Sequence, residues 1–213
     1  MRNINLFIKL LIDFFGSLVG LIIISPILII IAILIKLTSK GPVFFKQERL
    51  GKNGKVFKII KFRTMVVNAE KIGDGLMVKS ENDNRITKIG RFLRATSLDE
   101  LPQLFNVLKG DMSLVGPRPP VLYHPYKYED YSSFQKRRFD MRPGMTGLAQ
   151  VTVRNSVPWD DRIKIDVEYV EKFNIWLDIK ILFKTLLKIF RRESIYIQPE
   201  KDNILSSKIN INV

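Results

Sequence analysis

Residues 14–35 read FFGSLVGLIIISPILIIIAILI, an apolar run without a charged side chain. At about 1.5 Å of rise per residue, a helix of this length reaches across the ~30 Å hydrocarbon core of a bilayer. The run is too long for the apolar part of a signal peptide, and no small-x-small cleavage site follows it. It therefore predicts a membrane helix that persists in the mature chain and makes residues 1–40 an anchor.

Ser25 and Pro26 interrupt this run near its middle. A proline inside a helix removes one backbone hydrogen bond and clashes with the preceding turn, so we expect a bend. Under the positive-inside rule, cations on both sides of the run favour a helix–break–helix that enters and leaves by one cytoplasmic face. These cations are Arg2, Lys9, Lys36 and Lys40. A spanning helix with a mild kink remains open, because spanning helices also tolerate proline.

The composition restricts the chemistry more than it identifies it. Lys and Arg total 35 against 21 Asp and Glu, a net charge of +14, which attracts nucleic acid, anionic lipid or phosphorylated substrates. The chain has no cysteine and only His124 as an imidazole, which excludes disulfides, thiolate sites and multi-histidine zinc sites. Catalysis must then depend on carboxylates, Arg, Lys or a bound ion.

Residues 41–194 are expected to form one compact α/β domain, mainly helical, and residues 195–213 a flexible tail. Two short strands are predicted at residues 43–47 and 56–62, with Asn53 and Gly54 supplying the positive φ angles of the turn between them. The second strand leads into KFRTM at residues 61–65, where Lys61 and Arg63 are candidate phosphate contacts. A solvated basic edge strand explains the same residues equally well.

Two helices are predicted after a polar loop at residues 68–85. The first covers residues 87–93 and is followed by Arg94; the second begins near Asp99, with Asp99 as its N-cap, and stops at Gly110. A helix start favours a nearby phosphate and keeps a carboxylate ionised, so Asp99 and Glu100 are candidate catalytic residues. Acidic residues at such a position are also ordinary caps, and the sequence alone leaves both readings open.

Two further segments carry candidate phosphate contacts or glycines. Arg118 lies between prolines at residues 116–120, a rigid mount for a guanidinium that clamps phosphate, although a structural turn is the alternative. Residues 142–151 combine a cation with two glycines that permit tight turns or close approach, and Arg154 follows them.

Residues 175–192 read IWLDIKILFKTLLKIFRR, with lysines four apart on one helical stripe and bulky apolar side chains elsewhere. A soluble core helix with a lysine face would have this pattern. Because the chain also carries a membrane anchor, we favour an amphipathic helix at the lipid surface.

Together these segments resemble the small monotopic bacterial phosphoglycosyl transferases, the bacterial sugar transferase family. The resemblance rests on five motifs in the same order, over about residues 5–192: Ser25-Pro26, KFRTM at 61–65, the segment 94–102 with its SLDELP core, GPRP at 116–119, and residues 142–151.

The resemblance implies transfer of a sugar phosphate from a UDP-sugar to polyprenyl (undecaprenyl) phosphate, with release of UMP. It makes Asp99 the nucleophile, in a ping-pong reaction through an aspartyl-phosphosugar. Glu100 becomes its partner, in binding Mg²⁺ with Asp99 or in managing protons, and Arg94, Arg118 and Arg154 become phosphate and nucleotide contacts. It further implies a re-entrant helix touching one leaflet of the bacterial inner membrane, a cytoplasmic catalytic domain, and lipid contacts.

Two alternatives of other classes remain. A membrane-tethered nucleic-acid-binding protein would explain the charge but not the motifs, so we expect no nucleic-acid partner. A non-enzymatic scaffold would make Asp99 only a cap. The sequence leaves open the donor sugar, the glycan pathway, a homo-oligomeric state and the role of residues 121–139.

Overall fold

A computed structural model describes residues 2–72, 83–153 and 157–190, so the expected tail at 195–213 lies outside the described residues. The described chain is mainly helical, as predicted, with two small two-stranded sheets. Its helices are α1 (Arg2–Thr38), α2 (Lys88–Ala95), α3 (Gln103–Lys109), α4 (Ser133–Lys136), α5 (Leu148–Thr152), α6 (Trp159–Glu171) and α7 (Ile175–Phe190). Its strands are β1 (Phe44–Leu50), β2 (Val56–Phe62), β3 (Ser113–Val115) and β4 (Gly144–Thr146).

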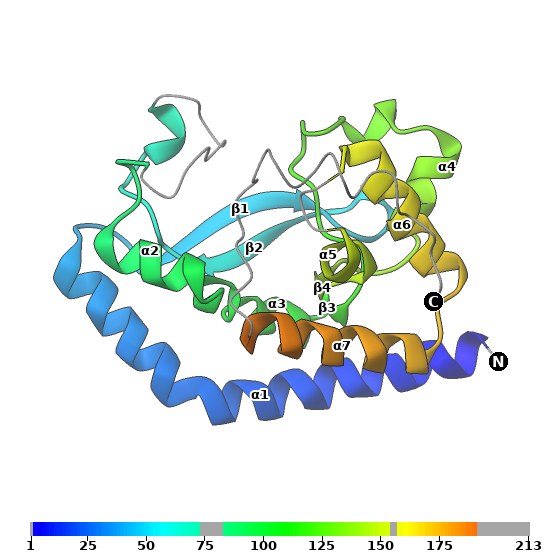
Figure 1. The fold of residues 1–213 in the computed structure, drawn as a ribbon, viewed down its shortest axis with the longest axis horizontal. Coiled ribbons are helices and arrows are strands. Elements are labelled where there is room, and N and C mark those ends of the chain that lie inside the picture. The colour runs from blue at the N-terminus through cyan, green and yellow to red at the C-terminus, as the bar shows by residue number, and fades with distance from the viewer. Residues whose placement is uncertain (1, 73–82, 154–156, 191–213) are drawn as a thin grey trace.

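Helix α1 is one continuous helix of 37 residues, about 55 Å long, and it bends along its course (Figure 1). The expected break at Ser25 and Pro26 is wrong, because the helix runs through Pro26. Proline has no N–H to offer the carbonyl four residues earlier, which belongs to Ile22. The Ser25 hydroxyl donates to that carbonyl at 2.8 Å instead, so the helix bends without ending.

In its N-terminal half, α1 buries polar side chains and exposes apolar ones, the reverse of a soluble amphipathic helix. Its buried face begins with Lys9, Asp13, Ser17 and Leu21, spaced four apart, while apolar side chains such as Ile22 cover the outer face. In the described chain, α1 is the helix long and apolar enough to cross a membrane. A face of exposed isoleucine and phenylalanine is stable against lipid and costly in water.

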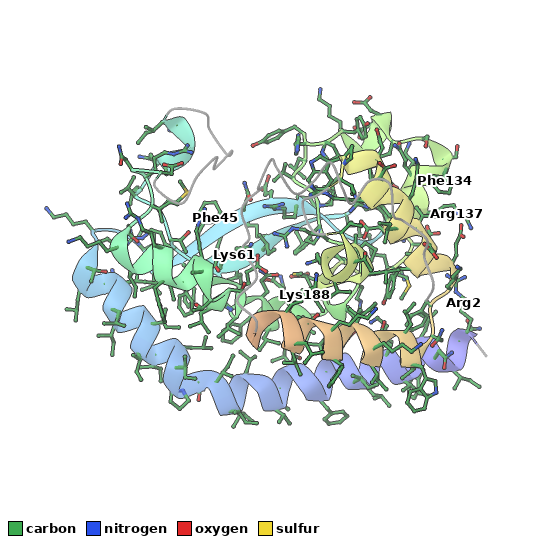
Figure 2. All side chains as sticks on the ribbon, in the orientation of Figure 1. Arg2, Phe45, Lys61, Phe134, Arg137 and Lys188 are labelled. Atoms are coloured by element: carbon green, nitrogen blue, oxygen red, sulfur yellow. The ribbon has the colours of Figure 1, made fainter. Side chains whose placement is uncertain are left out.

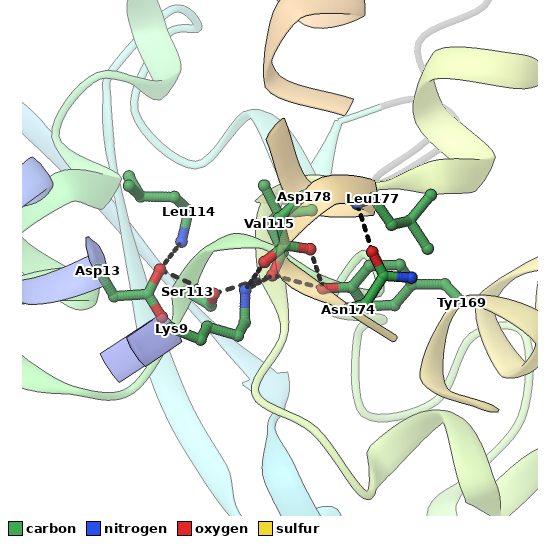
Figure 3. Close-up of polar contacts among 9 residues, drawn as sticks. All are labelled: Lys9, Asp13, Ser113, Leu114, Val115, Tyr169, Asn174, Leu177 and Asp178. Carbon is green, nitrogen blue, oxygen red and sulfur yellow. Dashed lines mark hydrogen bonds and ion pairs between the residues drawn. The ribbon is translucent and has the colours of Figure 1, made fainter. Parts of the chain in front are cut away.

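Two buried side chains fix the N-terminal third of α1 to the domain (Figure 3). Lys9 Nζ lies 2.6 Å from Asp178 Oδ2 on α7 and donates to the Val115 carbonyl at 2.8 Å. One turn along, Asp13 Oδ1 accepts from the Ser113 hydroxyl and the Leu114 N–H, both at 2.9 Å. The polar residues of α1 thus meet partners on β3 and α7.

The C-terminal part of α1 packs on the same body. Ile31 and Ile35 are buried against Phe62 of β2 and Leu93 of α2. Figure 1 shows the rest of the described chain on one side of α1, with α7 beside its N-terminal half and α2 near its other end. Both ends of α1 therefore pack against the same part of the described chain.

The predicted hairpin is confirmed. Strands β1 and β2 pair antiparallel with Phe44 opposite Phe62, and Asn53 and Gly54 have φ angles of 55° and 72°. The first strand extends to Leu50, three residues beyond the prediction, because Leu50 still pairs with Val56.

Strands β3 and β4 pair in parallel because two glycines let their backbones approach. A Cβ on Gly144 would lie 2.0 Å from the Gly116 nitrogen, so close approach, rather than a turn, explains this glycine. Helix α3 ends at Gly110 with φ 87°, as predicted. Helix α7 buries Ile181 and exposes Trp176 and Phe183, the amphipathic pattern expected.

Removing one member of the Lys9–Asp178 pair should destabilise the domain strongly. Lys9→Met leaves Asp178 buried without its cation, and we expect a loss of about 3 kcal/mol in the free energy of unfolding. Lys9→Met/Asp178→Leu should recover most of that loss, because apolar side chains replace a desolvated pair. Thermal unfolding in detergent, followed by circular dichroism, measures both, with the exposed Lys180→Met as control. An unchanged midpoint in Lys9→Met would contradict the interpretation.

Candidate functional site

Asp99 and Glu100 lie in a short 3₁₀ turn, Leu98–Glu100, not at the start of an α-helix. Ser97 adopts the left-handed conformation at φ 57° and turns the chain out of α2, and the Glu100 N–H then bonds to the Ser97 carbonyl at 3.2 Å. Helix α3 starts only at Gln103, because Pro102 cannot donate a hydrogen bond into the preceding turn. The prediction that Asp99 is the N-cap is therefore wrong.

Glu100 is held between two cations from separate elements. Lys61 Nζ on β2 lies 2.5 Å from Glu100 Oε1, and Arg118 Nη2 lies 3.5 Å from the same oxygen. Burial alone would raise the pKa of Glu100, but the two cations outweigh it and hold the pKa at about 2. Glu100 is therefore ionised at any physiological pH, and its charge offsets part of the two cations' charge.

Asp99 has the opposite electrostatic environment. Burial, followed by the Glu100 carboxylate, raises the pKa of Asp99 to about 6, while the cations of Lys61 and Arg94 act in the other direction. A carboxylate with a raised pKa is more basic than a solvated one, and it is still mostly ionised at neutral pH. The two adjacent acids thus differ in pKa because their neighbours differ.

Arg94 reaches this site from the last turn of α2. Its Nε donates to the Thr64 hydroxyl at 2.9 Å. The helix lies tightly against the segment after β2, since a Cβ on Gly90 would be 2.0 Å from the Thr64 carbonyl. Strand β2 itself is fixed by Asn106 of α3, whose side-chain amide bonds to Ile60 N and to the Lys58 carbonyl. Lys61, labelled in Figure 2, is therefore placed by a rigid strand in the middle of the molecule.

The other sequence-predicted residues are not all in this group. Arg63 is buried and donates to the Lys40 and Ser39 carbonyls and the Ser39 hydroxyl, so it holds the end of α1. Arg154 lies outside the described residues. The structure thus groups five of the predicted residues: Asp99, Glu100, Lys61, Arg94 and Arg118. Arg63 lies outside this group, at the end of α1.

Arg49 on β1 was missed by the sequence analysis. It donates to the Pro119 carbonyl at 3.0 Å, and burial and the Arg118 cation lower its pKa to about 10. The Arg49 charge also interacts with Glu100. No motif marks this arginine, because its place depends on the register of the hairpin rather than on a local pattern.

Within the described residues, the structure contains no cluster of three or more His, Cys, Asp or Glu side chains that could hold a metal ion. Asp99 and Glu100 form a pair only. Mg²⁺ commonly takes one or two carboxylates and completes its shell with water and substrate phosphate, so this pair fits a cation that arrives with a phosphorylated substrate.

The family model described as "Bacterial sugar transferase" matches residues 4–192. The chain belongs to the bacterial sugar transferase family. This confirms the resemblance inferred from the five motifs.

Relatives of this family member are similar over most of its length. It is 47% identical over 192 residues to the galactosyl transferase CpsE of Streptococcus agalactiae, covering 85% of this chain and 42% of the relative. It is 45% identical over 201 residues to the UDP-glucose:undecaprenyl-phosphate glucose-1-phosphate transferase of Klebsiella pneumoniae, covering 92% and 43%. The undecaprenyl-phosphate galactose phosphotransferase of Salmonella typhimurium is 44% identical, with coverage of 89% and 42%. The chain thus spans less than half the length of these relatives.

The raised pKa of Asp99 in this transferase family member is directly measurable. With ¹³C-labelled aspartate, the Asp99 carboxyl carbon, assigned by its loss in Asp99→Asn, should titrate by NMR with a midpoint of about 6. Lys61→Met removes a cation that lowers the pKa, so the midpoint should rise. Lys58→Met, exposed on the same strand, should leave it unchanged. A wild-type midpoint near 4, the value of a solvated aspartate, would contradict the described environment.

Proposed function

We propose that this chain transfers a sugar-1-phosphate from a UDP-sugar to polyprenyl phosphate, releasing UMP and forming a polyprenyl diphosphosugar. The observation that carries the proposal is the grouping of the adjacent carboxylates Asp99 and Glu100 with cations from separate elements: Lys61 Nζ and Arg118 Nη2 lie 2.5 and 3.5 Å from Glu100 Oε1. The raised pKa of Asp99 is consistent with this arrangement. The names of the Klebsiella and Salmonella relatives, which act on undecaprenyl phosphate, support the acceptor and the transferred group.

The reaction runs in two displacements at one phosphorus atom. A carboxylate oxygen of Asp99 attacks the phosphorus that carries the sugar, and the bond from that phosphorus to the oxygen of UMP breaks. UMP leaves with the bonding electrons and the enzyme holds an acyl phosphate at Asp99. An oxygen of polyprenyl phosphate then attacks the same phosphorus, and the carboxylate of Asp99 is released unchanged.

The cations supply the charge neutralisation that phosphoryl transfer needs. Without substrate, Glu100, the residue next to Asp99, engages Lys61 and Arg118. Arg118 is exposed enough, at 44% of its side chain, to turn toward an incoming diphosphate. Arg94 approaches Asp99 from helix α2. Arg154 stays a prediction from the resemblance.

Mg²⁺ is proposed as the cofactor, held by Asp99 and Glu100 together with substrate phosphate oxygens. When bound, it would neutralise charge on the diphosphate and orient it. Glu100, with its pKa near 2, offers a permanent carboxylate for this purpose.

We propose that α1 is re-entrant in the bacterial inner membrane, with the catalytic domain on the cytoplasmic face where UDP-sugars are made. Two observations support this. Both ends of α1 pack against one domain, which a spanning helix would have to divide across the bilayer. The outer face of α1 and that of α7, with Trp176 and Phe183, are apolar and exposed, as at a lipid surface.

The nucleophile is tested by trapping it. Wild type incubated with a UDP-sugar and Mg²⁺, without acceptor, should gain the mass of one phosphosugar on the peptide that contains Asp99, and polyprenyl phosphate should remove it. Asp99→Asn should fold, bind membranes and release UMP at less than a thousandth of the wild-type rate, because an amide is a poor nucleophile. The control is Asp130→Asn, an exposed aspartate in a similar 3₁₀ turn. A fully active Asp99→Asn, or an adduct on another residue, would disprove the mechanism.

The topology is tested with single introduced cysteines. Their labelling is unambiguous because the unaltered sequence contains no cysteine. Cysteines at positions 3 and 40 should both resist a membrane-impermeant thiol reagent in intact cells and react after lysis. Ser25→Ala/Pro26→Leu restores the backbone hydrogen bond to the Ile22 carbonyl and stabilises a straight helix by about 3 kcal/mol. A straight helix favours the spanning arrangement, so position 3 should become reactive from outside. External labelling of position 3 in the otherwise unaltered chain would establish a spanning helix instead.

A further inference from the structure

The proline-rich loop that carries Arg118 is held through four consecutive carbonyls. Three of its residues are prolines and have no N–H, so the main chain of the loop is fixed mostly from its carbonyl side. The carbonyls of residues 117–120 each accept one hydrogen bond. Their donors, in order, are Gly144 N at 2.9 Å, Arg138 Nη2 at 2.9 Å, Arg49 Nη1 at 3.0 Å and Leu50 N at 3.0 Å.

The donor to the Arg118 carbonyl itself is a fully buried side chain. Arg138 is 1% exposed, and the same Nη2 lies 2.6 Å from Asp166 Oδ2 on α6, which is 3% exposed. Its guanidinium lies over the ring of Phe139, 5.4 Å from the centroid. Nε and Nη1 of Arg138 have no hydrogen-bond partner among the described residues.

A buried ion pair of this kind contributes little net free energy to folding. Burying a carboxylate and a guanidinium costs several kcal/mol per ion, and a well-packed apolar pair is often as stable. Two unsatisfied guanidinium nitrogens add to that cost. What an apolar pair would not supply is the hydrogen bond to the Arg118 carbonyl.

We propose that Arg138, oriented by Asp166, is a positioning residue that fixes the main chain at Arg118 and thereby aims the Arg118 guanidinium at the donor diphosphate. The inference rests on the proposed function, in which Arg118 contacts that diphosphate. Arg138 does not touch substrate. It bonds to the main chain of Arg118, whereas Glu100 contacts the Arg118 side chain at 3.5 Å.

The test is a double-mutant cycle on UMP release, with KM for the UDP-sugar and kcat measured separately. Arg138→Lys keeps a cation for Asp166 but loses the forked geometry that serves both oxygens. It should raise KM at least tenfold and lower kcat by less. The matched control is Arg137→Lys, the adjacent arginine, which pairs with Glu171 at the periphery of the molecule and should change KM less than twofold (Figure 2).

The decisive measurement repeats Arg138→Lys in an Arg118→Ala background. If Arg138 acts through Arg118, the second substitution should change KM less than twofold there, because contacting residues that act as one unit are not additive. A full tenfold effect in that background, or an unchanged KM in Arg138→Lys alone, would overturn the inference. If Arg138→Lys lacks the wild-type thermal transition, the same cycle is run with Asp166→Asn and the same criteria apply. Absence of UMP release in wild type would instead reject the proposed function.

Discussion

The ion pair between Lys9 on α1 and Asp178 on α7 is the interaction on which the rest of the structure depends. It joins the first helix of the described chain to the last and holds both against β3 through the Val115 carbonyl. Because Lys9 and Asp13 have partners on this inner side, the exposed residues of α1 between positions 10 and 35 can be apolar. If α1 lies in a membrane as proposed, a helix built this way would fix the height of the domain above the lipid, and with it the height of Asp99.

That geometry matters for the proposed reaction, which would join a water-soluble donor to a lipid-bound phosphate. The residues around Asp99 come from β2, α2 and the proline-rich loop, which are fixed to each other by backbone contacts such as Gly90 against the Thr64 carbonyl. None of these elements is long, and their mutual placement depends on α1 packing under β2 and α2. Helix α1 is thus part of the hydrophobic core that supports the site, in addition to its proposed role as an anchor.

The sequence predicted the features that depend on local pattern: the apolar run, the hairpin with its positive φ residues, and the family itself. It failed where the outcome depends on hydrogen-bond partners or helix bounds that the pattern does not reveal. Pro26 does not break α1 because the Ser25 hydroxyl satisfies the Ile22 carbonyl, and Arg63 faces the end of α1 rather than the site. The cap predicted at Asp99 was wrong because Pro102 delays the helix. In the first two cases a hydrogen-bond partner, not the propensity of the segment, determined the structure.

In the proposed mechanism, the electrostatics at Asp99 are a compromise between two requirements of an attacking carboxylate. Burial and the Glu100 charge raise its pKa and so its basicity, which favours attack on phosphorus; Lys61 and Arg94 limit the rise and keep it ionised near neutral pH. Glu100 contributes to both effects. Its negative charge raises the pKa of Asp99, and it also pairs with Lys61, whose cation lowers the pKa of Asp99. In the proposed mechanism, the donor diphosphate would draw Lys61 and Arg118 away from Glu100. The net negative charge near Asp99 would then increase unless a cation arrived with the diphosphate. A divalent cation arriving with the diphosphate would restore the balance, which is a physical reason to expect Mg²⁺ at this pair of carboxylates.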